Sequence, residues 1–191
     1  MTRPQRLFIY LTLSILLLVA VYTVNSTSNY NWSGVNKNSN VLTGALRHIF
    51  LFKSLFWLII LNSAIFIVST FRQNRQRKAL IYTTALCLFF LLFNALVNRL
   101  CAPYYYLVFQ NQTVAEEYIN IPLQRAGVSI APILVEHIDN KNMAYRRYAI
   151  QQLANFKYAP VNSTLKRIMN DTTEESYIRE DAHQALISIN K

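Results

Sequence analysis

The first 115 residues of this 191-residue chain contain no aspartate and no glutamate. The same stretch contains ten lysines and arginines, so it carries a formal charge of +10. All nine acids lie in the remainder, where nine bases balance them. A proton-coupled carrier depends on acidic groups inside the membrane, and their absence here argues against that class. The asymmetry predicts one part in lipid and one in water.

Glycine, histidine and cysteine are also scarce. Only three glycines occur, which excludes a glycine-rich phosphate loop. The three histidines do not stand at a metal-binding spacing, so we expect no metal, no cofactor and no enzymatic activity. Cys87 and Cys101 would lie about 21 Å apart on one helix and could not form a disulfide.

Long apolar runs are what the first half has in abundance. They cover 7–24, 49–71 and 79–101, and each approaches the roughly 20 residues that a helix needs to cross the hydrocarbon core. The first run, preceded by Arg3 and Arg6, also suits a signal peptide. It is longer than the usual apolar core of one and no small-residue cleavage site follows, so we expect a retained helix.

The positions of the basic residues predict an orientation. The segment 72–78 holds four positive charges in seven residues, and Arg3 and Arg6 add charge at the N-terminus. Because cytoplasmic loops are rich in lysine and arginine, we expect both to be cytoplasmic, with 25–48 and 102–191 on the other side. This topological interpretation of the basic charge is favoured over nucleic-acid binding, and the inverted topology is the alternative.

The polar segment 25–48 separates the first two runs. We expect a loop that ends in a short interfacial helix over 41–52, because Leu42, Leu46 and Ile49 share one face. Lys53 would then extend its ammonium group outward from the first turn of the second span.

Four polar residues lie inside the expected spans. Neutral amides in membranes commonly hold helices together, so we interpret them as packing contacts, with a lining role in a transport path as the alternative. The depths expected for two of the asparagines differ by about 8 Å, which predicts that Asn62 bonds its own helix or a partner chain rather than Asn94. The candidate intramembrane contacts are Asn62, Asn94, Asn98 and Arg99.

From 102 onward, charges of both signs appear and apolar residues become periodic. Thr113 and Glu116 have the spacing of a capping box at a helix start. Pro122 predicts two short helices or a kinked one, and Gly127 predicts a helix end.

The chain then repeats itself at a period of about 33 residues. Ala149 and Leu153 recur as Ala182 and Leu186, at positions that predict close helix packing within and between units. The repeat also places Asp139 and Asp171 near the turns between helices, where we expect them to pair with Arg146 and Arg179 respectively.

At these residues the segment 129–190 resembles the short bacterial HEAT-like repeats, whose pattern is an Asp near the turn followed by Val-Arg-x-x-Ala-x-x-Ala-Leu. The match is close at 178–186 and weaker at 145–153. The resemblance implies a small α-solenoid, and solenoids present surfaces to other proteins. It implies no catalytic site, because no suitable residues accompany the repeat.

The expected fold class is therefore all-α, with three transmembrane helices followed by a small helical HEAT-like domain over 102–191. We expect a non-enzymatic accessory subunit in a bacterial inner membrane, which contacts lipid and other membrane subunits as a homo- or hetero-oligomer. The alternatives are an oligomeric transporter or channel component and, more weakly, an enzyme subunit whose cofactor lies elsewhere in its complex. The candidate partner contacts are Tyr145, Arg146, Arg147, Tyr148 and Arg179.

Overall fold

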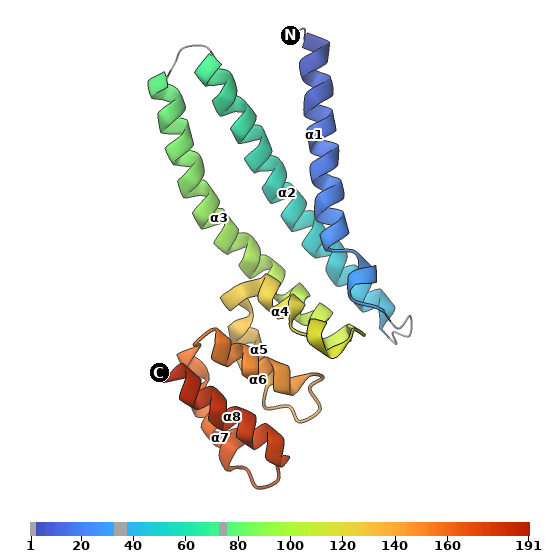
Figure 1. Cartoon of the computed structure of the whole chain (residues 1–191), viewed down its shortest axis with the longest axis vertical. Coiled ribbons are helices and arrows are strands. Elements are labelled where there is room, and N and C mark those ends of the chain that lie inside the picture. The colour runs from blue at the N-terminus through green and yellow to red at the C-terminus, as the bar shows by residue number, and fades with distance from the viewer. Residues whose placement is uncertain (1–2, 33–37, 73–75) are drawn as a thin grey trace.

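A computed structural model describes residues 3–32, 38–72 and 76–191. Every regular element in these ranges is helical, as predicted (Figure 1). The three longest helices are α1 (Arg3–Val24), α2 (Ser39–Arg72) and α3 (Gln76–Asn111). The shorter helices gather at one end of this trio, and they are α4 (Ile121–Ala126), α5 (Ala131–His137), α6 (Arg146–Asn155), α7 (Asn162–Asn170) and α8 (Ser176–Ile189).

The three long helices are each long and apolar enough to cross a membrane. α2 and α3 pack along each other, yet only 6% of the most apolar stretch of α3 is buried, against 17% for α1 and for α2. In Figure 1, α1 diverges from α2 toward the N-terminus, and α2 and α3 run as a hairpin. Most of their apolar surface is therefore left for lipid or for another protein.

The first turns of α2 correct the expected interfacial helix over 41–52. No break separates them from the rest of α2, which runs without interruption from Ser39 to Arg72. Their apolar face is buried, with Leu42, Leu46 and Ile49 at most 3% exposed, in the same cluster as Val108 and Phe109 of α3. The face that would suit a membrane surface is covered by protein instead.

The helix expected to end at residue 101 is longer than predicted, because α3 continues to Asn111. Pro103 lies inside this helix, although proline removes a backbone hydrogen bond from a helix interior. The flanking Cys101, Ala102 and Tyr105 are all buried, so packing on the neighbouring helices offsets that cost. A single continuous helix, α3, thus joins the apolar hairpin to the shorter helices.

The segment after α3 differs from the predicted capping box. Thr113 pairs with Asn31 in an isolated parallel bridge, and its hydroxyl donates to Asn31 Oδ1 over 2.8 Å. The 3-10 helix Glu116–Tyr118 begins without a side-chain cap, because that hydroxyl is already engaged with the loop after α1.

The predicted effects of proline and glycine on the next helix are confirmed. A separate short helix, α4, carries Pro122 in its first turn. It ends at Gly127, whose φ of 62° lies in the left-handed region where glycine is favoured. A further 3-10 helix, Gly127–Ile130, leads into α5.

The last four helices form two successive pairs, α5 with α6 and α7 with α8, linked by the 3-10 helix Ala159–Val161. The repeated residues Ala149, Leu153 and Ala182 are fully buried, and Leu186 is 8% exposed. α6 and α8, the second helices of the two pairs, pack on each other. This arrangement brings the N-terminal ends of α6 and α8 together at one surface.

Candidate functional site

A groove with a volume of about 570 Å³ lies where α6 and α8 begin. Four of the five predicted contact residues line it, namely Tyr145, Arg146, Arg147 and Tyr148, and Arg179 does not. The opposite wall comes from the turn before α8 and from the first residues of that helix, including Glu174 and Tyr177. The groove therefore joins the start of one repeat unit's second helix to the start of the next.

The floor of the groove is a buried ion pair between Arg146 and Glu174. The guanidinium donates two parallel hydrogen bonds to the carboxylate, of 2.7 and 2.9 Å, and both side chains are at most 6% exposed. Arg146 also donates from Nε to the backbone carbonyl of Ile138. Hydrogen bonds from Arg146 lower the pKa of Glu174 below its ordinary value. Because both charges are desolvated and paired, Arg146 positions the groove and offers little of its charge to a partner.

A second carboxylate at the end of α7 fixes the turn that carries Glu174. Asp171 accepts hydrogen bonds from the hydroxyl and the backbone amide of Thr173, at 2.6 and 2.9 Å, and forms an ion pair with Lys141 at 3.1 Å. These donors lower the pKa of Asp171 to about 2. Lys141 also bonds the Thr173 hydroxyl, so both turns are tied together across the repeat.

The aspartates of the inter-helix turns form ion pairs, but their predicted partners are wrong. Asp139 pairs with Arg167 rather than with Arg146, and Asp171 pairs with Lys141 rather than with Arg179. Arg146 and the aspartate expected to pair with it belong to one unit, whereas the observed pairs all cross between units. The Nε atom of Arg179 is buried without a hydrogen-bond partner among the described residues.

Arg147 and the two tyrosines form the accessible rim. The side chain of Arg147 is 50% exposed and donates to Asp181 over 2.7 Å. Tyr145 donates its hydroxyl to the carbonyl of Gln112 over 2.8 Å, and Tyr148 donates to the Glu116 carboxylate, which raises the pKa of Tyr148. Both tyrosines thus connect the groove to the segment after α3 while remaining half-buried.

Sequence patterns missed the residues on the α8 side. Tyr177 is an exposed aromatic ring, and Glu174 is buried. The repeat in the sequence does indicate that successive inter-helix turns, and so the residues next to them, come together. Lys141 and Thr173 lie in successive inter-helix turns and lie near each other once the units stack.

The intramembrane candidates are not brought together. Asn62 donates to the carbonyl of Leu58 in its own helix over 2.7 Å, which confirms the first of the predicted alternatives. Asn98 accepts a 2.6 Å hydrogen bond from Lys53, so this lysine does not extend outward as expected. Asn94 is half-buried in the middle of α3, and Arg99 is exposed one turn further on.

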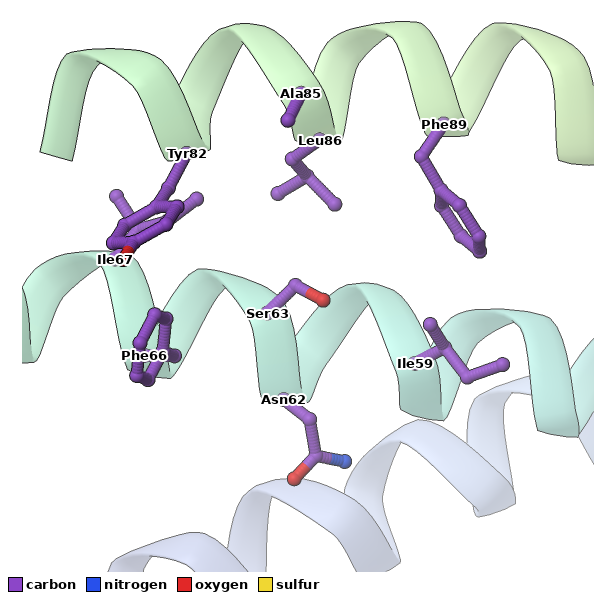
Figure 2. Close-up of a pocket in the computed structure, with 9 residues that line it drawn as sticks. All are labelled: Ile59, Asn62, Ser63, Phe66, Ile67, Tyr82, Ala85, Leu86 and Phe89. Atoms are coloured by element: carbon purple, nitrogen blue, oxygen red, sulfur yellow. The ribbon is translucent and has the colours of Figure 1, made fainter. Parts of the chain in front are cut away.

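A cleft of about 490 Å³ lies between α2 and α3 (Figure 2). Ile59, Phe66, Leu86 and Phe89 give it mainly apolar walls. Figure 2 shows Asn62 projecting from α2 away from α3, so the amide sits at the margin of the cleft. None of the other three candidates lines it, and a continuous polar path does not follow from these residues.

Comparisons of the chain with protein-family models, with curated proteins and with solved structures find no match. Among the described residues, no group of three histidines, cysteines or acids lies close enough to hold a metal ion. The function is therefore argued from the geometry of the groove and of the long helices.

Proposed function

We propose that this chain is a membrane-embedded accessory subunit that binds another protein through the groove at the start of α6 and α8. The observation that carries the proposal is the composition of that groove. Met143, Tyr145, Tyr148, Arg147 and Tyr177 line it, and tyrosine, methionine and arginine are the residue types enriched at protein interfaces.

The framework around the groove supports a binding role. A buried ion pair and the ties between turns hold the floor, while Tyr177 remains 52% exposed and Arg147 half exposed. A framework whose turns are already held in place loses less entropy when a partner binds than one that must first become ordered. The resemblance of the sequence 129–190 to HEAT-like repeats agrees with this role, since such repeats commonly bind proteins.

The arrangement of charge supports three membrane crossings. Nineteen residues separate Lys53 from Arg72, which is about 29 Å of helix and close to the thickness of the hydrocarbon core. The proposed orientation keeps the N-terminus and the basic segment 72–78 in the cytoplasm of a bacterial cell. The groove then faces the periplasm. Within 72–78, residues 73–75 lie outside the described ones.

The proposal is tested by photocrosslinking from the groove in intact cells. A photoreactive amino acid at position 177 is expected to capture one defined protein, whereas the same group at exposed position 163, on α7, should not. Combining Arg147→Ala with Tyr177→Ala should abolish co-purification of that protein in a gentle detergent. A lone monomer, with no crosslink from position 177, would contradict the proposal.

A further inference from the structure

A second cleft, of about 440 Å³, opens where the end of α1 meets α2, α3 and α4. Its lining combines an apolar wall with three polar groups. Residues 17–24 of α1 and Trp57 of α2 form the wall, and Asn25, Lys53 and Arg125 supply the polar groups. These polar groups come from three segments that are distant in the chain, so only the tertiary structure brings them together.

Both cations of this cleft bond only neutral groups among the described residues. Lys53 Nζ donates to Asn98 Oδ1 over 2.6 Å. Arg125 Nη1 donates to the Val24 carbonyl over 2.7 Å and to the Tyr30 hydroxyl, and its guanidinium lies 5.5 Å from the centre of the Tyr30 ring. Neither forms an ion pair in the ranges that the structure describes. Two half-buried positive charges therefore face one cleft without a counter-ion, which is costly in a medium of low polarity.

The third polar group presents an unused acceptor. Asn25 is 7% exposed, and its Nδ2 donates to the Val21 carbonyl over 2.8 Å. Its Oδ1 is buried and accepts no hydrogen bond from the described residues. A ligand that satisfies the cleft would thus combine a negative charge with a hydrogen-bond donor.

The apolar wall of the cleft indicates that the ligand also has an apolar part. It consists of the aliphatic side chains on the last turns of α1, together with the Trp57 ring, and it continues along the part of α1 that is apolar enough to cross a membrane. Lys53 lies about 29 Å along α2 from Arg72, so the cleft falls near one membrane surface. The phosphate of an anionic lipid at this surface would supply the negative charge that Lys53 and Arg125 lack.

We propose that this cleft is a binding site for an anionic phospholipid with a hydroxylated head group, such as phosphatidylglycerol. The phosphate lies between Lys53 and Arg125, a head-group hydroxyl donates to Asn25 Oδ1, and one acyl chain follows the end of α1. The proposal is independent of the partner protein proposed above and requires only that the long helices cross a bilayer.

Trp57 provides a reporter inside the site, because the chain has only one other tryptophan, Trp32. The Trp32→Phe variant of the full chain is reconstituted in phosphatidylcholine vesicles that contain increasing fractions of brominated phosphatidylglycerol. Brominated phosphatidylglycerol is expected to quench Trp57 at lower mole fractions than brominated phosphatidylcholine. The Lys53→Gln variant should need about fivefold more of it for half-maximal quenching, since one basic residue near the surface contributes about that factor.

Two further variants separate the site from general surface charge. Arg47→Gln removes an exposed positive charge from the same end of α2, outside the cleft. It should leave unchanged the preference for phosphatidylglycerol over phosphatidylcholine. Asn25→Asp is nearly isosteric and places a carboxylate in the cleft as an internal counter-ion, so it should remove most of the preference. Size-exclusion elution and helical circular dichroism confirm that each variant is folded.

Three outcomes would overturn the proposal. Equal quenching by the two brominated lipids would show that the cleft does not select an anion. An equal loss for Arg47→Gln would assign the preference to the general surface charge. Abolition of the preference by inorganic phosphate in the buffer would identify a soluble anion rather than a lipid as the ligand.

Discussion

Arg146 is the residue on which the C-terminal helices depend most. It begins α6, and it bonds the backbone of Ile138 before the helix and the carboxylate of Glu174 from the following unit. A buried charge pair adds little stability compared with an apolar pair, but the loss of one partner leaves the other charge buried and alone. The pair therefore sets which turns can face each other.

The Glu174→Gln substitution tests this role. It leaves the Arg146 guanidinium buried without its counter-ion, so we expect the free energy of unfolding to fall by about 3 kcal/mol. The measurement is urea denaturation of the full chain in detergent micelles, followed by tyrosine fluorescence and circular dichroism. The matched control is Asp139→Asn, which breaks the exposed pair with Arg167 and should cost less than about 1 kcal/mol. Equal losses would contradict the burial argument.

Asp171 predicts how stability depends on pH. Its pKa in the folded protein is lowered from 3.8 to about 2, so the unfolded chain takes up a proton at a higher pH than the folded one. The stability from its bonds to Thr173 and Lys141 is complete above the unfolded pKa and is lost as pH falls toward about 2. The lowered pKa of Glu174 acts in the same direction.

Thermal denaturation between about pH 5 and pH 2 measures this dependence. Asp171→Asn should lower the melting temperature at pH 5 and make its decline toward pH 2 shallower. Asp139→Asn, a change to an exposed acid in the preceding turn, should retain the steep decline. If Asp171→Asn melts with the same pH dependence as the unmodified chain, the assigned bonds do not stabilise the turn.

At the scale of the helices, α6 and α8 each carry a small buried residue. Ala149 on α6 and Ala182 on α8 are fully buried, and the two helices pack on each other. Larger side chains in a packed seam force neighbouring groups from their preferred conformations, typically at a cost of about 1–3 kcal/mol. The close approach of these helices therefore limits what can replace either alanine.

Ala182→Leu is expected to destabilise the full chain by about 2 kcal/mol in urea denaturation. Ala144→Leu provides the control, because Ala144 is exposed before α6 and should tolerate the larger side chain. A neutral result for Ala182→Leu would show that the seam can open without cost. Crosslinking from position 177 then indicates whether the groove retains its partner.

At the scale of the whole molecule, one buried cluster runs from the first turns of α2 through the end of α3 to α8. The change in composition near Glu116 therefore does not coincide with a break in the core. Leu42 and Ile49, from the acid-free part of the chain, belong to the same core as Leu165 and Ile178. The end of the helical hairpin and the repeat helices therefore share one buried core.

The proposed topology predicts which side of the membrane carries the repeat helices. A cysteine at exposed position 163 should react with a membrane-impermeant maleimide in cells whose inner membrane is intact. The unmodified chain is the control, because Cys101 is buried and Cys87 lies in the middle of α3. Labelling that appears only after the inner membrane is permeabilised would place the helices in the cytoplasm and reverse the proposed orientation.

The amino-acid sequence alone determined the helical class, the three long apolar helices and the helix end at Gly127, because periodicity, length and backbone freedom are local properties. It also predicted that Asn62 bonds its own helix or a partner chain rather than Asn94, and the structure shows the bond within its own helix. It could not predict the Arg146–Glu174 pair, the Lys53–Asn98 bond or the meeting of Asn25, Lys53 and Arg125. These contacts join residues 28 to 100 positions apart, and only the packing of the helices decides which of several similar charges lie within reach.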